Sequence, residues 1–172
     1  MPLERDRPRR LSLDTNVLVG FGERRPSLLD FLTLAREIGH ELCVTETTLA
    51  ETEHLARAVE DSSLRRAAQC ALDLRAEWKI QASVPATLAE RDAAEQLAAW
   101  LRKRGWIPTS QYRDSLIIAE TSIARVPILV TTDPHFFSDN GKLALSFSLI
   151  DARPVAVYRP AQLIRFWLTG RI

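Results

Sequence analysis

The chain has 172 residues and a net charge of +1, from 23 Lys and Arg against 22 Asp and Glu. This length suits one domain with its own hydrophobic core. Hydrophobic residues make up 46% and charged residues 26%, which excludes a disordered chain and is typical of a globular protein. The near-zero net charge gives no overall signature of a nucleic-acid-binding protein, although local clusters of charge matter more than the sum.

Targeting signals and cysteines narrow the class of protein further. Residues 1–10 are rich in Arg and lack a following apolar stretch, so we expect no secretory signal. We expect this charged segment to be disordered and a single packed domain to span 11–172. No apolar run approaches the roughly 20 residues that a membrane helix needs. The only two cysteines, Cys43 and Cys70, offer no disulfide framework, and we expect a cytoplasmic protein.

Short apolar runs alternate with segments of helical periodicity along the chain. The first buried strand, 11–13, ends in the polar turn 14–16, and Val17-Leu18-Val19 follows. Further strands are expected at 41–44, 128–131, 147–150 and 155–157. Helices are expected at 26–38, 45–59, 64–78, 86–104, 110–124 and 160–168. This alternation predicts an α/β fold, a three-layer α/β/α sandwich around a mainly parallel sheet.

Four acidic residues fall where the expected strands end or the expected helices begin. Asp14 follows the first strand and Asp133 follows the strand 128–131. Glu51 and Asp114 lie in the first turns of two helices. In an alternating fold, helices begin at the same edge of the sheet at which strands end, and ligands bind there. We therefore expect the four carboxylates to converge on one edge.

The chemistry of such a cluster points to a metal ion. Crowded carboxylates repel each other, and a divalent cation relieves the repulsion. Mg²⁺ and Mn²⁺ prefer oxygen ligands of this kind. A bound ion lowers the pKa of a water molecule and stabilises charge on a phosphodiester. The pattern therefore favours metal-dependent hydrolysis of phosphodiester bonds.

Three of the acids also have a purely structural interpretation. Asp14 suits an Asx turn, and Asp133 suits the turn before a proline. Asp114 suits the dipole at the N-terminus of a helix. Taken one at a time, these alternatives stay open, but together they need a coincidence at one edge of the sheet.

Glu51 is the least specific of the four acids. Thr48 and Glu51 have the spacing of a capping box, which would make the glutamate structural. Glu46 and Glu53 lie in the same helical segment and compete with Glu51 for a place in the cluster.

Four segments of the chain resemble the signature blocks of the PIN-domain family, in the family's order. They are LDTNVLV at 13–19, LAE at 49–51, RDSLIIA at 113–119 and LVTTDPHF at 129–136. The resemblance implies a PIN-like, Rossmann-like sandwich, dependence on Mg²⁺ or Mn²⁺, and endonuclease activity on RNA. It makes Asp14, Glu51, Asp114 and Asp133 the catalytic metal ligands, and the preceding Leu-Ala favours Glu51 over its rivals.

The resemblance also implies supporting residues and partners. Asn16 and Thr132 match polar residues that line the site in relatives, and Asn16 is expected to orient Asp14 or a metal-bound water. Many bacterial relatives are VapC-type toxins that a partner antitoxin inhibits, and relatives often form homodimers. The stretch 61–104 makes this chain longer than those toxins. A non-toxin RNA-processing nuclease and a non-catalytic interaction module with the same fold therefore remain alternatives.

Basic residues provide candidate contacts for a nucleic acid. Arg24, Arg25 and Arg113 lie near the expected edge and could bind phosphates, against the alternative of a solvated surface. Arg102-Lys103-Arg104 with Trp106 combines charge and an aromatic ring, as single-stranded RNA-binding proteins do. The same basic residues also suit the C-terminal dipole of a helix, and the sequence alone favours that alternative.

Overall fold

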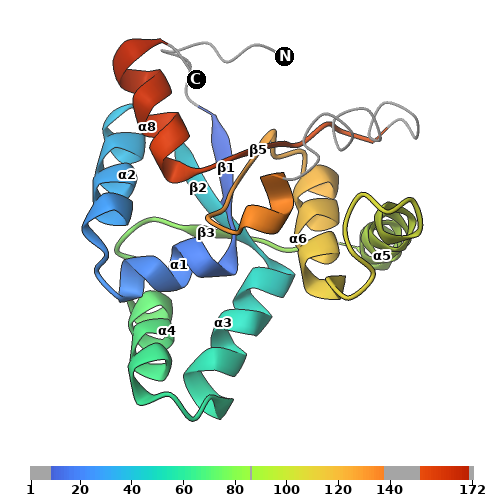
Figure 1. The fold of residues 1–172 in the computed structure, drawn as a ribbon, viewed down its shortest axis with the longest axis horizontal. Helices are drawn as coiled ribbons and strands as arrows, with labels where there is room; N and C mark the ends of the chain where they lie inside the picture. Colours follow the sequence, from blue (N-terminus) through green and yellow to red (C-terminus); the bar gives the residue numbers. More distant parts are fainter. Residues whose placement is uncertain (1–8, 86, 138–151, 171–172) are drawn as a thin grey trace.

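A five-stranded parallel sheet forms the centre of the protein (Figure 1). The structure is a computed structural model and describes residues 9–85, 87–137 and 152–170. The strand order is β3-β2-β1-β4-β5. The strands are β1 (Arg10–Leu13), β2 (Glu41–Thr45), β3 (Gln81–Ser83), β4 (Ile128–Val130) and β5 (Ala156–Tyr158). The strand order reverses between β1 and β4, so a ligand-binding crevice is expected where these two strands end.

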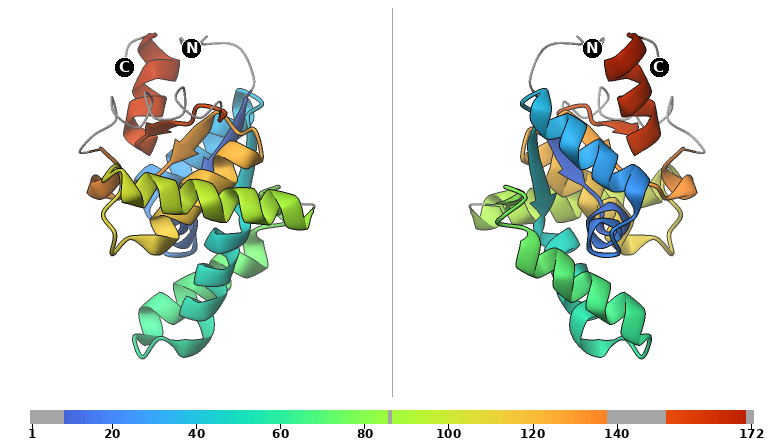
Figure 2. Two further views of the ribbon diagram at one scale, coloured as in Figure 1. Left: turned by 90° about the vertical axis from the view of Figure 1, so that its right-hand side faces the viewer. Right: turned by 90° about the vertical axis from the view of Figure 1, so that its left-hand side faces the viewer.

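Helices cover both faces of the sheet (Figure 2). On one face, Leu11 and Leu13 of β1 pack with α1, α2 and α8, and on the other face Leu129 of β4 packs with α5 and α6. The helices are α1 (Thr15–Gly22), α2 (Pro26–Glu37), α3 (Glu46–Ala58), α4 (Ser62–Leu74), α5 (Leu88–Lys103), α6 (Tyr112–Ile123) and α8 (Pro160–Thr169), with a 3₁₀ helix η1 (Pro134–Phe137). This arrangement confirms the predicted α/β/α sandwich. None of the helices in the described ranges combines the length and hydrophobicity needed to cross a membrane.

Two elements differ from the sequence-based expectation. The turn after β1 is the start of a helix, α1, in which 17–21 are all buried. A run buried on all sides lacks the periodicity that distinguishes a helix from a strand. The edge strand β3 is not among the strands expected from the sequence, because it has only three residues, Gln-Ala-Ser, and no apolar run marks it. The expected strand 147–150 lies outside the described residues, and Arg10, which we had grouped with the N-terminal segment, begins β1.

Close contact between α1 and α4 depends on Gly22. A Cβ atom at this position would lie 1.9 Å from the carbonyl oxygen of Ala67 in α4. We expect Gly22→Ala to destabilise the protein by about 2–3 kcal/mol, because backbone atoms must move to relieve the clash. This corresponds to a fall in Tm of roughly 5–10 °C, measurable by thermal unfolding.

Gly105→Ala is the matched control for this substitution. Among the described residues, no atom beyond the chain neighbours lies within 4 Å of a Cβ at Gly105, whose φ is +71°. The substitution therefore costs only the strain of a left-handed backbone, about 1–2 kcal/mol. Unchanged stability in Gly22→Ala would contradict the close packing of α1 on α4.

Candidate active site

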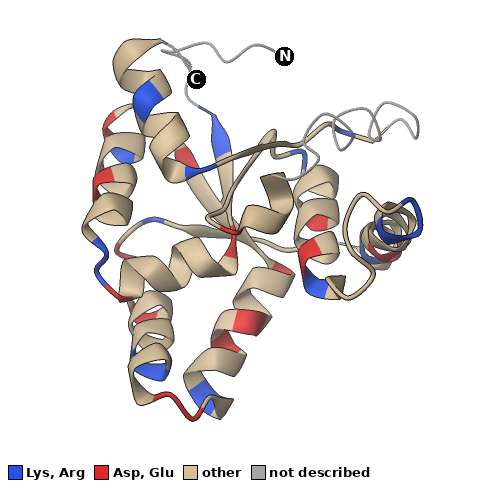
Figure 3. Ribbon diagram, viewed as in Figure 1, with Lys and Arg blue, Asp and Glu red and all other residues tan. Residues whose placement is uncertain are grey.

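The four predicted acids line one cavity at the carboxyl end of the sheet. The cavity has a volume of about 290 Å³, and Asp14, Glu51, Asp114 and Asp133 contribute to its wall. Its other lining residues are Thr15, Asn16, Val19, Glu23, Arg25, Leu55 and Leu64. In Figure 3, red segments mark acids at the start of α1, along α3 and on the lower half of α6. The fold therefore brings together acids that lie far apart in the sequence.

Asp14 is the most constrained of the four acids. It is 4% exposed and is the N-cap of α1. Its Oδ1 accepts a hydrogen bond from the Thr15 backbone N–H at 2.7 Å. Its Oδ2 accepts hydrogen bonds from Asn16 Nδ2 at 2.8 Å and from the Thr131 hydroxyl at 2.6 Å. Since a carboxylate oxygen has two acceptor positions, Oδ1 keeps one for a further ligand.

Thr131, rather than the expected Thr132, contributes the hydroxyl at this site. Thr131 is fully buried, and its oxygen also accepts the Asp133 backbone N–H at 3.0 Å. The Thr132 side chain is exposed, and this residue instead donates its backbone N–H to Asn16 Oδ1 at 3.2 Å. Because β4 is buried on both faces, its sequence has no alternating pattern that would show which threonine points inward. Asn16 thus links Asp14 to the chain that follows β4.

Glu51 reaches the cavity from the second turn of α3. The Thr15 hydroxyl donates a short hydrogen bond to Glu51 Oε2, and Arg113 Nη1 lies 3.5 Å from Oε1. The capping-box alternative does not hold, because the N-cap of α3 is Thr45, whose hydroxyl accepts the Thr48 N–H. The Thr15 and Arg113 contacts therefore account for the position of the Glu51 carboxylate.

The two rivals of Glu51 have partners elsewhere. Glu46 forms an ion pair with Arg91 of α5 at 3.0 Å. Glu53 is exposed and faces Arg57 on its own helix at 3.7 Å. Neither glutamate lines the cavity.

Asp114 and Asp133 are the other two acids in the wall of the cavity, and they lie close enough for their charges to repel each other. None of the described residues donates a hydrogen bond to the Asp114 carboxylate. Asp133 Oδ1 accepts the His135 backbone N–H at 2.8 Å, as expected for an aspartate at a turn. His135 is exposed and lines a neighbouring hollow together with Asp114. Of the four carboxylates, that of Asp114 therefore has the most acceptor positions left for a ligand.

Burial and like charge raise the pKa values of two of these acids. Burial raises the pKa of Asp14 to about 7, and the charges of Asp114 and Glu51 add to the rise, against the Thr131 and Thr15 hydrogen bonds. Burial, followed by repulsion from Asp133 and Glu51, raises the pKa of Asp114 to about 6. The cavity is thus an environment in which extra negative charge is costly and positive charge is favoured.

The donor set fits a hard divalent cation. All four groups are carboxylates, the oxygen ligands that Mg²⁺ and Mn²⁺ prefer. Within the described ranges, no three His, Cys, Asp or Glu side chains already converge as ligands of one ion. Mg²⁺ commonly keeps several waters and uses one or two carboxylates together with substrate phosphates, so a complete protein cage is not required.

Buried polar side chains hold in place the elements that carry the acids, and no sequence pattern indicated them. Glu120 of α6, 7% exposed, accepts the Thr47 N–H at 3.1 Å and the Thr47 hydroxyl at 2.8 Å. The Thr48 hydroxyl donates to the Leu13 carbonyl at 3.3 Å. These contacts join the first turn of α3 to both α6 and β1. Because α3 carries Glu51, these contacts also fix the position of Glu51 relative to Asp14 and Asp114.

The three arginines expected to contact phosphate differ in their position relative to the cavity. Arg25 lines the cavity, with its guanidinium in contact with Glu23. Arg113 lies beside Glu51 and is 58% exposed. Arg24 is exposed, has a left-handed backbone (φ 55°), and does not line the cavity.

Thr131→Val tests the hydrogen bonds around Asp14, because it removes the hydroxyl while keeping the shape of the side chain. We expect a loss of about 1–3 kcal/mol in stability, since buried polar partners are left without a bond. If a metal binds here, its affinity falls by roughly 10–100-fold. Thermal unfolding and calorimetric titration with Mn²⁺ measure the two effects. Thr131→Ser should retain both properties, and Thr132→Val, at an exposed position, should change neither; equal effects of the two valine variants would contradict the assignment.

Comparison with known proteins places the chain in a family. The family model described as the PIN domain matches residues 11–143. No protein with a curated function matches the sequence. Among solved structures, the fold is similar to a chain in the crystal structure of VapBC2 from Rickettsia felis bound to a DNA fragment from their promoter, with a TM-score of 0.59 and 16% identity over 87% of this chain and 98% of that chain. The chain therefore belongs to the PIN-domain family, whose members are generally nucleases.

Proposed function

We propose that the protein is a metal-dependent endoribonuclease that hydrolyses phosphodiester bonds of RNA. The observation that carries the proposal is the convergence of four carboxylates, from four distant segments, on one cavity at the reversal point of the sheet. Membership of the PIN-domain family adds support. Two of the acids, Asp14 and Asp114, have raised pKa values, and acids of this kind in a cavity are a frequent feature of functional sites.

Asp14, Glu51, Asp114 and Asp133 would hold Mg²⁺ or Mn²⁺, directly or through water. When bound, the ion would polarise the phosphodiester and lower the pKa of an attacking water. Thr131 and Asn16 keep the Asp14 carboxylate in one orientation through their hydrogen bonds.

The arginines at the cavity would bind the substrate. Arg25, which lines the cavity, and Arg113, which lies beside Glu51, would contact phosphates that flank the bond to be cut, with Arg24 as a more distant candidate. Their present partners, Glu23 and Glu51, are acidic, so a phosphate would replace one anionic contact by another.

The direct test is cleavage of RNA by the purified protein with Mg²⁺ or Mn²⁺. We expect internal cuts with either ion and none with a chelator. Intact RNA under all metal conditions, together with no Mn²⁺ binding by calorimetry, would favour the non-catalytic interaction module. Light scattering would show whether the expected homodimer forms.

A toxin of a type II toxin–antitoxin system is a more specific form of this function. The observation in its favour is the similarity in fold to a chain of the VapBC2 structure. Growth arrest on expression of the wild type, relieved by a protein encoded next to it, would support a toxin with a cognate antitoxin. Normal growth together with RNA cleavage in vitro would instead support the alternative of an RNA-processing nuclease.

A further inference from the structure

The turn between α5 and α6 carries a concentration of positive charge. Residues 102–113 contain Arg102, Lys103, Arg104 and Arg113 and no acidic residue. We call this segment the α5–α6 corner. Figure 3 shows its basic residues in blue at the end of α5 and at the start of α6. The protein as a whole has a net charge of +1, so this density of positive charge is local.

Specific contacts join the α5–α6 corner to the acidic cavity. The Arg102 guanidinium donates a short hydrogen bond to the hydroxyl of Ser115, the residue after Asp114. Trp106 and Asp114 line the same hollow beside η1. Arg113 lies 3.5 Å from Glu51. Arg113 therefore lies beside a cavity-lining acid, and Arg102 is bonded to the residue that follows another of these acids.

The cations at the outer end of the corner are available to a ligand. Lys103 and Arg104 are exposed, and neither forms an ion pair with any residue that the structure describes. Arg104 lies over the Trp100 ring at 5.5 Å, which orients its guanidinium without neutralising it. These cations therefore keep their charge for an external anion.

Aromatic groups are interleaved with these cations. Tyr112 is 45% exposed and has the Arg102 guanidinium 4.7 Å from its ring centroid. Trp106 stacks on Trp100 with the ring centroids 6.4 Å apart. The indole N–H of Trp106 is buried and has no acceptor among the described residues. Cations along a track with an exposed aromatic ring are the features that single-stranded nucleic acids bind through phosphates and bases.

We propose that the α5–α6 corner binds a single-stranded segment of the RNA substrate and leads it into the acidic cavity. The inference rests on the proposed function and adds the path of the strand. Phosphates contact Lys103, Arg104 and Arg113, and a base stacks on the exposed part of Tyr112. The helix dipole accounts for basic residues at the end of α5. It does not account for Arg113 at the start of α6, where a cation is unfavourable to the dipole.

Fluorescence anisotropy with a labelled single-stranded RNA of about 16 nucleotides tests the surface, since such sites cover up to roughly this length. Titrations in EDTA measure binding without metal-dependent cleavage. We expect the double variant Lys103→Gln/Arg104→Gln to bind on the order of tenfold more weakly at low salt. Its slope of log affinity against log salt should fall by roughly 1.4, because each lost phosphate contact contributes about 0.7.

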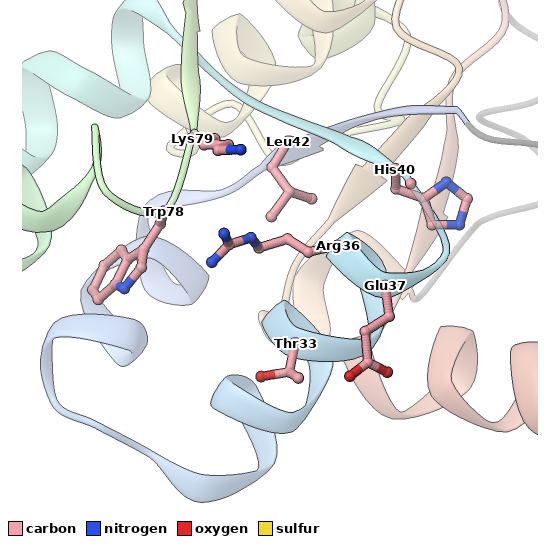
Figure 4. Close-up of a pocket in the computed structure, with 8 residues that line it drawn as sticks. Thr33, Arg36, Glu37, His40, Leu42, Trp78 and Lys79 are labelled. Atoms are coloured by element: carbon pink, nitrogen blue, oxygen red, sulfur yellow. The ribbon is translucent and has the colours of Figure 1, made fainter.

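A second basic pair provides the matched control. Arg36 and Lys79 line a separate cavity of about 430 Å³, formed by the end of α2, the start of β2 and the segment before β3, together with Trp78 (Figure 4). Arg36→Gln/Lys79→Gln removes the same charge and should leave RNA affinity and salt slope unchanged. Tyr112→Ala should weaken binding about tenfold with the same slope. Tyr112→Phe, which loses only the hydroxyl bonds to Glu95, should bind as the wild type does.

The outcomes separate this proposal from the proposed function. Equal affinities and slopes in the two double variants, with RNA still cut, would refute the surface and leave the nuclease intact. No RNA binding or cleavage by the wild type would refute both. Stronger binding of a poly-glutamate peptide than of RNA, lost in Lys103→Gln/Arg104→Gln, would refute a nucleic-acid surface and indicate an acidic protein partner.

Discussion

Asp14→Asn is expected to reduce RNA cleavage at saturating Mn²⁺ by on the order of 10³-fold or more. A metal ion supplies several kcal/mol of transition-state stabilisation, and each 1.36 kcal/mol is a factor of ten in rate. The amide keeps the size of the carboxylate but removes its charge. It also places an NH₂ group against donors, because Asn16 Nδ2 and the Thr131 hydroxyl both donate to Oδ2 in the wild type.

Initial rates on a defined RNA and calorimetric titration with Mn²⁺ would measure the effect of this substitution. Glu53→Gln is the control, because Glu53 is exposed on the same helix as Glu51 and lies outside the cavity. It should cleave RNA at the wild-type rate. Wild-type cleavage by Asp14→Asn would remove Asp14 from the active site and with it the proposed mechanism.

The stability of the metal-free protein is expected to reveal the raised pKa of Asp14. The folded-state pKa is about 7, against 3.8 for an ordinary aspartate. The group therefore favours folding fully below pH 3.8, and this contribution is lost as the pH rises through 7. The difference of about 3 pKa units corresponds to roughly 4 kcal/mol at pH 8.

Comparison with Asp14→Asn isolates this contribution, because the variant lacks the titrating group. Relative to the wild type, Asp14→Asn should gain stability between pH 4 and pH 8 by up to about 4 kcal/mol in the presence of EDTA. Urea unfolding at several pH values measures the difference. Any pH-independent cost of rearranged hydrogen bonds cancels in it. The same relative stability at both pH values would contradict a raised pKa.

Mn²⁺ is expected to counteract the loss of wild-type stability at high pH, because the ion favours the ionised carboxylates. The rise in Tm on adding Mn²⁺ should therefore be larger at pH 8 than at pH 5.5. Asp14→Asn should lose most of this rise.

Much of the fold could be predicted from the sequence, because buried strands and amphipathic helices have distinct periods. The acids could be proposed as a cluster because topology alone puts strand ends and helix starts at one edge. The structure places Asp14, Glu51, Asp114 and Asp133 on one cavity, and their role in catalysis stays a prediction. Helix α1 could not be predicted, since it is buried on nearly all sides and has no polar face to mark its period.

The supporting residues were harder to predict than the acids. Thr131 and Thr132 are adjacent and chemically identical, and only the direction of the chain after β4 distinguishes them. Glu120 lies in an apolar stretch of α6, and its partner Thr47 is 73 residues away in the sequence. Such contacts depend on how α3 packs on α6, which local patterns do not encode.

The attachment of α3 and α4 also bears on how this protein can diverge. The first turn of α3 is fixed by Glu120 and by the Leu13 carbonyl, and α4 is fixed where Ala67 meets Gly22. The connection between the two helices, around Asp61, lies at the far end of both and is exposed. Residues inserted in this connection would not move the anchored parts of α3 and α4, and a longer loop carries only a small entropic cost. The connection between α3 and α4 is therefore a place where relatives can acquire new recognition surfaces without a change in the position of Glu51.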